Sequence, residues 1–371
     1  METDMHTNDI AKFLISKGIP SSDVIIYKDH KEIYRFMCGH KDAEKTEEIK
    51  GDELYYLYSA SKVITCTAAM RLVERGIIGI DDPVSKYIPE YAHLTYKSND
   101  GIKPCEKVMT VRHLFAMRGG LNYNLQSAPI KALLAETNNK ADTVSLVKSF
   151  IKDPLEFEPG EGFQYSLCHD VLGAIIEIAS GKSFGEYLRT EIFEPLGMKN
   201  TGFFPTEEQK KRFATQYRYE NDTYKVVPCT CAYRLSDNYE SGGAGLFSCV
   251  NDYIKFADAL ACGGVAYNGY QLLKPETIKL MRENQQREDT PSIKIGYKYA
   301  FGVRSMFNKE EANSDGDTEE EFGWDGAASA YVAIDPKNHL SIFYAEQVLN
   351  HGWAYSDVHP VLRDSMYYLS K

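Results

Sequence analysis

Two stretches of the chain match the pattern Ser-x-x-Lys, which places a serine and a lysine one helical turn apart. They run from Ser59 to Lys62 and from Ser145 to Lys148. Side chains three residues apart share a helix face, and a neutral lysine amine can take a serine proton and make the oxygen a nucleophile. The pattern fixes only two residues, so the surrounding sequence has to separate chemistry from coincidence.

Ser59 has the more favourable surroundings. It lies where the aromatic segment LYYLY (54–58) meets the apolar helical run VITCTAAMRLVERG (63–76). Unpaired N–H groups at a helix start favour a developing negative charge. The chain neighbours of Lys62 carry no carboxylate, so burial should lower its pKa. On the motif alone, an N-cap serine beside a lysine that extends to solvent is an equally good interpretation.

The other candidate serines have simpler interpretations. Ser145 lies in the amphipathic run VSLVKSFI, where Lys148 is expected to face water. Ser183 lies in the pattern Gly-x-Ser-x-Gly, but a helix precedes it where a nucleophile elbow needs a strand. With Glu186 three residues later, Ser183 fits a capping box instead.

Composition and charge exclude several classes of protein. The 371 residues include 42 basic and 53 acidic side chains, a net charge of −11, which disfavours binding to nucleic acid or to anionic lipid. No apolar run approaches the ~18 residues of a membrane-spanning helix, and Met1 to Ile10 lacks the features of a secretion signal. We therefore expect a soluble, cytoplasmic protein whose eight cysteines are thiols.

Neither a metal nor a cofactor is expected. The nine histidines form no ligand-spaced cluster and there is no H-E-x-x-H pattern. Cys229 and Cys231 form a lone C-x-C, for which a structural role outweighs a metal site. The expected partners are small molecules.

Strand-like segments at both ends of the chain flank a helical middle. A hairpin is predicted over 23–36, further strands over 299–306, 329–334 and 340–346, and a helix over 358–369, whereas helical spacing dominates between them. This pattern predicts an α/β (α+β) protein. One domain, residues 1–80 and 235–371, would hold a sheet built from both termini, and residues 81–234 would form an inserted all-helical domain.

Several phrases together resemble the serine β-lactamase and penicillin-binding-protein-like superfamily, in its branch of class C β-lactamases and family VIII carboxylesterases. The resemblance covers nearly the whole chain after about residue 23. The phrases are LYSASKVITCTAAMRLVERG, IDDPVSKYIPEY, TVRHLFAMRGGL, EPGEGFQYSLCHDVLGAIIEIASG, FEPLGMKNTGF, SGGAGLFSCVNDYIKFADAL and GWDGAASAYVAIDP. It implies an antiparallel sheet flanked by helices, and it favours Ser59 and Lys62 as catalytic residues.

The resemblance assigns two further catalytic elements. The family pattern Tyr-x-Asn falls on Tyr165, Ser166 and Leu167, so Tyr165 would share protons with Lys62. The literal Ser236-Asp237-Asn238 is a rival, but its place in the chain does not match that of the family motif. The strand motif Lys-Thr-Gly falls on 324–326, and the N–H groups of Ser59 and Ala327 would form the oxyanion hole.

The sequence departs from the family at positions that contact substrate. Trp324 and Asp325 precede Gly326 where the family has a lysine and a threonine, and Leu167 replaces an asparagine. Losing charge-assisted hydrogen bonds there should weaken binding of β-lactams and peptide carboxylates by ~1.5–3 kcal/mol each. The esterase-like branch has similar Trp-Gly-Gly-type elements.

The sequence therefore predicts a serine hydrolase that works through an acyl-enzyme on a small ester or amide with an uncharged acyl part. One alternative is a β-lactamase or D-Ala-D-Ala carboxypeptidase, and another is a binding module with little turnover. His351 and Trp353 follow the last strand, where a place near the site and a place on a surface loop are equally good interpretations.

Overall fold

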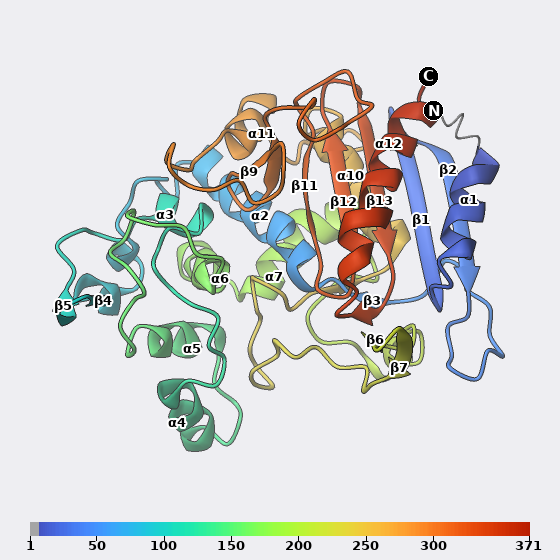
Figure 1. The fold of residues 1–371 in the computed structure, drawn as a ribbon. Helices are drawn as coiled ribbons and strands as arrows, with labels where there is room; N and C mark the ends of the chain where they lie inside the picture. The colour runs from blue at the N-terminus through green and yellow to red at the C-terminus, as the bar shows by residue number, and fades with distance from the viewer. Residues whose placement is uncertain (1–6) are drawn as a thin grey trace.

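A seven-stranded antiparallel sheet organises the computed structural model, which describes residues 7–371 (Figure 1). Its strand order is β2-β1-β13-β12-β11-β10-β9, so the two amino-terminal strands pair with strands from the carboxyl-terminal end. The strands are β1 (Ser21–Lys28), β2 (Lys31–Gly39), β9 (Tyr297–Tyr299), β10 (Arg304–Met306), β11 (Phe322–Asp325), β12 (Tyr331–Asp335) and β13 (Leu340–Ala345).

The two faces of the sheet are covered by different helices because alternate strand residues point to opposite sides. Val24 and Ile26 of β1 pack in a cluster with α1 (Thr7–Ser16) and α12 (His359–Leu369). Ile25 belongs to the main core on the other side, with α2 (Ser61–Glu74) and α10 (Val250–Ala261). Figure 1 shows α1 and α12 side by side in front of the sheet. The sheet built from both termini is confirmed.

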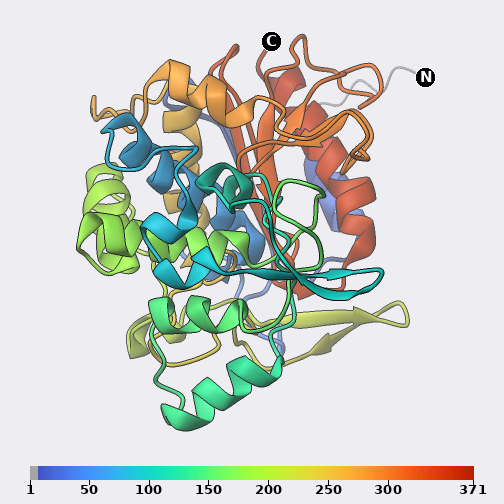
Figure 2. The same ribbon diagram turned by 90° about the vertical axis from the view of Figure 1, so that its left-hand side faces the viewer.

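Helices α3, α4, α5 and α6 lie beyond α2, away from the sheet (Figure 1), and this side of the molecule faces the viewer in Figure 2, whereas α11 contacts α2 and lies beside β9. The central one is α6, which packs against α2, α3 and α5. The bounds of these and the remaining helices are α3 (Val111–Phe115), α4 (Ala128–Glu136), α5 (Thr143–Phe150), α6 (Cys168–Ser180), α7 (Phe184–Leu188), α8 (Glu194–Leu196), α9 (Glu207–Lys210) and α11 (Pro275–Arg282). The division into domains at residues 80 and 235 stays a prediction.

Short strands form three smaller sheets, and two sequence expectations need adjustment. β3 (Tyr55–Tyr56) pairs with β8 (Phe247–Ser248), β4 (Thr95–Ser98) with β5 (Gly101–Pro104), and β6 (Tyr217–Glu220) lies between β7 (Thr223–Val226) and β14 (Val348–Leu349). β4, β5, β6 and β7 lie within residues 81–234, so the region predicted to be all-helical holds two pairs of short strands besides its helices. The run 299–306 is not one strand, because it turns back at Gly302, with φ +79°, between β9 and β10.

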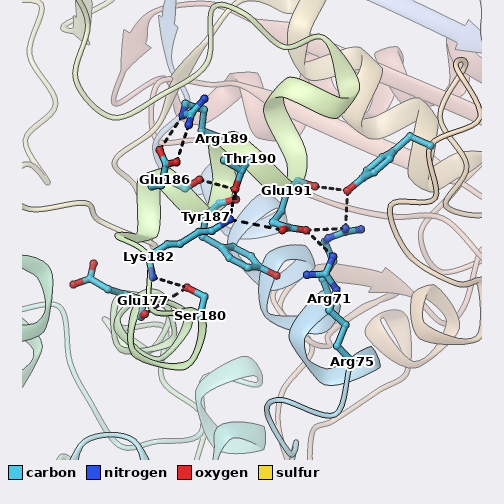
Figure 3. A network of polar contacts seen from close by, with 11 residues as sticks. Arg71, Arg75, Glu177, Ser180, Lys182, Glu186, Tyr187, Arg189, Thr190 and Glu191 are labelled. Carbon is cyan, nitrogen blue, oxygen red and sulfur yellow. Dashed lines mark hydrogen bonds and ion pairs between the residues drawn. The ribbon is translucent and has the colours of Figure 1, made fainter.

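Buried charge ties α2 to the helical region (Figure 3). Glu191 Oε2 accepts from Arg71 Nη2 at 3.1 Å and from Arg75 Nη2 at 2.6 Å, and Arg71 is only 6% exposed. Burial would raise the pKa of Glu191, but its bonds to Arg75 and Arg71 outweigh burial and lower it. The carboxyl-terminal half of α2 is thus fixed, which leaves its first turn in a defined place.

None of the helices within residues 7–371 is long and apolar enough to cross a membrane. The expectation that Met1 to Ile10 carries no secretion signal concerns mainly residues 1–6, which lie outside the described residues.

Candidate active site

Ser59 lies on a strained turn between β3 and α2. A 3-10 turn, Tyr58–Ala60, joins the two elements, and Tyr58 has φ +47°, a left-handed conformation that costs a bulky residue free energy. Tyr58 is held there because its ring is buried and its hydroxyl donates to Gln216 Oε1 at 2.9 Å. The half-buried Ser59 is thereby presented at the entrance of the helix, as predicted.

Lys62 extends from the first turn of α2 back to Ser59. Its Nζ lies 3.3 Å from Ser59 Oγ, 3.0 Å from the Tyr123 hydroxyl and 2.6 Å from the Gly243 carbonyl oxygen. The side chain is fully buried. Burial lowers the pKa of Lys62 to about 7, against an opposing effect of the Asp170 carboxylate. A substantial fraction of the amine is therefore unprotonated near neutral pH.

Tyr165 completes the predicted trio. Lys62 Nζ lies over its ring, 4.5 Å from the centroid, and its hydroxyl accepts a hydrogen bond from Trp324 Nε1 at 2.9 Å. Burial raises the pKa of Tyr165, although hydrogen bonds to Ser59 and Trp324 act in the opposite direction. Tyr165 is therefore a neutral phenol, so Lys62 is the better base of the two.

The third motif, residues 324–326, lies directly beside the Ser59 turn. The Gly326 backbone passes so near Leu57 that a Cβ at this glycine would lie 2.3 Å from the Leu57 carbonyl oxygen. The Gly326 carbonyl accepts from the Tyr355 hydroxyl at 2.7 Å, and the half-buried Ala327 packs in one cluster with Tyr58. These contacts bring the strand end and the serine turn together.

Asp325 is paired with a basic side chain. Its Oδ1 accepts from Arg304 Nη1 at 2.8 Å and lies 3.6 Å from His359 Nδ1. Burial would raise the pKa of Asp325, but the Arg304 charge, the contact with His359 and the Lys294 charge together outweigh burial and lower it. The negative charge inferred from the sequence is therefore largely compensated within the protein, which reduces its repulsion of an anionic substrate.

Leu167 is buried at the start of α6, where it lines a hollow together with Ile130 and Phe150 of the neighbouring helices. Its backbone N–H donates to the Asn122 carbonyl at 3.2 Å. An apolar side chain among apolar neighbours explains the residue locally, and its contact with substrate stays a prediction.

Sequence reasoning missed two polar residues of the site. Tyr123 contacts Lys62 directly and stacks on Tyr165 with ring centroids 5.7 Å apart. Asp170 is fully buried, and its Oδ1 accepts from the Tyr239 and Ser241 hydroxyls, each at 2.6 Å. The one signal in the sequence for Asp170 is that it follows Tyr165 by five residues. Tyr123 lies in a loop, where no periodic pattern could have indicated its place in the site.

His351 and Trp353 belong to an aromatic cluster with the β6–β7 hairpin. The Tyr224 hydroxyl is hydrogen-bonded to His351 Nε2 at 3.3 Å, and the Tyr219 ring lies 5.2 Å from that of His351. His351 Nδ1 also pairs with the buried Glu346. Both residues therefore have a structural role, because their rings pack the β6–β7 hairpin against the chain that follows β13.

The rival serines have local partners. Lys148, three residues after Ser145, pairs with Glu90 at 2.8 Å. Ser183 caps α7 by accepting the Glu186 N–H at 3.2 Å, which is one of the two hydrogen bonds of the predicted capping box. Ser236 donates to the Ala141 carbonyl. These contacts give Lys148, Ser183 and Ser236 structural roles, so none of them requires a catalytic role.

A Ser-x-x-Lys motif at the entrance of a helix, together with an antiparallel sheet built from both termini, is typical of the β-lactamase-like class of proteins. The chain belongs to the Beta-lactamase family, which matches residues 6–352. Esterase EstB of Burkholderia gladioli is 31% identical in an alignment of 264 residues that covers 64% of each chain. Protein Rv1367c of Mycobacterium tuberculosis is 25% identical in an alignment of 326 residues that covers 83% of this chain and 81% of the relative.

Solved structures share the fold. EstCE1, described as a hydrolase with promiscuous acyltransferase activity, has a TM-score of 0.80 with 24% identity and covers 97% of both chains. The similarity to the superfamily noted in the sequence is thus confirmed at the level of family and fold.

The Tyr123 contact predicts a measurable loss. Replacing Tyr123 with Phe removes one hydroxyl from Lys62 and keeps the stacked ring, so we expect fluorophosphonate labelling of the protein to slow by about three- to tenfold, the effect of one neutral hydrogen bond. Tyr233→Phe is the matched control, because its ring packs on Tyr123 at 5.6 Å. Equal rates for both variants would contradict a role of the Tyr123 hydroxyl.

Proposed function

We propose that this protein is a serine hydrolase that acts through an acyl-enzyme, as an esterase or amidase on small substrates with an uncharged acyl part. The observation that carries the proposal is the buried Lys62 amine, whose Nζ is 3.3 Å from Ser59 Oγ and whose pKa is lowered to about 7. A lysine in this state accepts a proton, whereas a structural surface lysine does not.

In the proposed acylation step, Ser59 Oγ bonds to the substrate carbonyl carbon while its proton passes to Lys62 Nζ. The neutral Tyr165 phenol gives its proton to the leaving alcohol or amine as the carbonyl carbon releases it, and recovers a proton from Lys62. Water then attacks the acyl-enzyme with the same groups in reverse roles. Because burial raises its pKa, the Tyr165 phenol keeps a proton to give, and the neighbouring Lys62 ammonium can replace that proton as it leaves.

The developing oxyanion would be held by the backbone N–H groups of Ser59 and Ala327. The close approach of Gly326 to the Leu57 carbonyl supports this assignment, since it brings the two donor-bearing segments together. Backbone donors do not depend on the side chains of the third motif, so the loss of Lys-Thr-Gly leaves them in place.

The preference for an uncharged acyl group follows from the charges at the site. Trp324 stacks on Tyr165 with ring centroids 5.6 Å apart, and Tyr299 meets Trp324 edge to face at 4.9 Å. Arg304, a cation of this region, is 2% exposed and paired with Asp325, so it is not available to a substrate carboxylate. An aromatic wall is suited to an apolar group. The similarity to an esterase supports the same substrate class.

Covalent labelling tests the nucleophile. A fluorophosphonate should add once, at Ser59, and Ser59→Ala should lose labelling and lower ester turnover by a factor on the order of 10³ or more. Ser145→Ala is the matched control in the second Ser-x-x-Lys and should behave like the unaltered protein. Labelling at another residue contradicts the assignment, and a lack of turnover on every substrate supports a binding module.

A substrate comparison tests the acyl preference. We expect kcat/KM for p-nitrophenyl butyrate to exceed that for nitrocefin, and for the p-nitrophenyl monoester of succinic acid, by a factor on the order of 10², since Arg304 is already paired with Asp325 and cannot bind their carboxylates. Preferential hydrolysis of nitrocefin or of a D-Ala-D-Ala peptide would instead establish the β-lactamase or carboxypeptidase alternative.

The lysine predicts the pH dependence. Lys62 must be unprotonated to act as a base, so kcat/KM should rise with pH through about 7 and then level off. The Asp170 carboxylate raises the pKa of Lys62, so Asp170→Asn should move this limb to lower pH, whereas the exposed Asp237→Asn should not move it. A limb that is unchanged in Asp170→Asn would refute the electrostatic link.

A further inference from the structure

A mixed cluster of His30, Asp258 and Cys262 lies apart from the serine site, where the β1–β2 hairpin tip meets the end of α10. His30 Nδ1 is 2.7 Å from Asp258 Oδ2, and Cys262 Sγ is 3.7 Å from Asp258 Oδ1. One ligand atom from each of the three residues can be chosen so that all lie within 4.8 Å of one another. Among the described residues this is the one His/Cys/Asp/Glu group with that property.

We propose that His30, Asp258 and Cys262 form a binding site for a zinc-like divalent cation. An imidazole nitrogen, a thiolate and a carboxylate oxygen are the three ligand types that zinc takes in proteins. Bonds of about 2.0–2.3 Å in a tetrahedron place ligand atoms about 3.5 Å apart. The atoms of this cluster therefore need shifts of only about 1 Å to close around an ion.

The electrostatic setting favours a cation. Cys262 immediately follows the last residue of α10, where the unpaired carbonyl groups and the helix dipole concentrate negative charge. Asp258 is 2% exposed, so its carboxylate is little screened by water. Asp29, whose Oδ1 pairs with His339 Nδ1 at 2.8 Å, adds a second carboxylate that acts on Cys262.

Ion binding balances as an exchange of protons for metal bonds. Burial, followed by the Asp258 carboxylate, raises the pKa of Cys262 to about 12, so without an ion the sulfur keeps its proton. A bound divalent ion reverses this balance. The thiol proton leaves to solvent as the metal–sulfur bond forms. The His30 ring gives up the proton that Nδ1 shares with Asp258 and carries its proton on Nε2 instead, so that metal–nitrogen and metal–oxygen bonds replace the His30–Asp258 hydrogen bond. The His30 side chain is 31% exposed, which leaves a path for the ion and for water as a fourth ligand.

Cobalt substitution tests the site on the full chain. Titration of the reduced, metal-free protein with Co²⁺ should give a near-ultraviolet thiolate-to-cobalt charge-transfer band that saturates at one ion per chain, and Zn²⁺ should displace it. Cys262→Ser should abolish the band, and His30→Ala should weaken binding by a factor on the order of 10–100. Cys229→Ser, which alters an exposed cysteine, is the matched control and should keep the band.

A second measurement uses the unaltered sequence, in case a variant fails to fold. Zn²⁺ should slow alkylation of Cys262 by iodoacetamide, read by peptide mass spectrometry, while that of Cys229 continues at its usual rate. No charge-transfer band, a band that survives in Cys262→Ser, or a band lost only in Cys229→Ser would overturn the proposal. The last result would move the site to the C-x-C pair.

Discussion

The proposed chemistry depends on burying one amine beside one hydroxyl. Lys62 has no exposed surface, and its three polar neighbours are all uncharged: Ser59, Tyr123 and the Gly243 carbonyl. A salt bridge in this place would hold the amine as an ammonium ion. Asp170 is near enough to oppose the effect of burial on the lysine pKa. Its Oδ1 accepts hydrogen bonds from the hydroxyls of Tyr239 and Ser241, which stabilise part of the carboxylate charge without Lys62.

Two glycines make this arrangement sterically feasible. A Cβ at Gly243 would lie 2.6 Å from Asp170 Oδ2 and 3.4 Å from Lys62 Nζ, so any larger residue would push the carboxylate and the amine apart. A Cβ at Gly326 would collide with the Leu57 carbonyl oxygen just ahead of the serine turn. Gly243 thus leaves room for the Lys62 amine and the Asp170 carboxylate. Gly326 allows the end of β11 to approach the turn that carries Ser59. Both lie in phrases that resemble the superfamily.

Local signals predicted the elements, and long-range contacts supplied what they missed. Alternation of apolar residues was sufficient for the β1–β2 hairpin and for β12 and β13, and the helix after Ser59 follows from its apolar run. The distant partners of Lys62 come from loops about 60 to 180 residues away, at Tyr123 and Gly243, where no spacing rule applies. The charge of Asp325 was read correctly, but its pairing with Arg304 arises only when β10 lies beside β11.

Helix α10 connects the serine site with the His30, Asp258 and Cys262 cluster. Its Tyr253 hydroxyl donates to the Ala60 carbonyl at 2.8 Å, one residue from Ser59, while its last turns carry Asp258 and precede Cys262. The Tyr253 ring also stacks on Phe343 of β13, with centroids 4.1 Å apart and planes 13° apart. The sheet therefore fixes Tyr253 independently of the hairpin tip. An ion at the cluster would stabilise the contact between β1, β2 and α10 and leave the position of Ala60 unchanged, so its effect should be on unfolding and not on turnover.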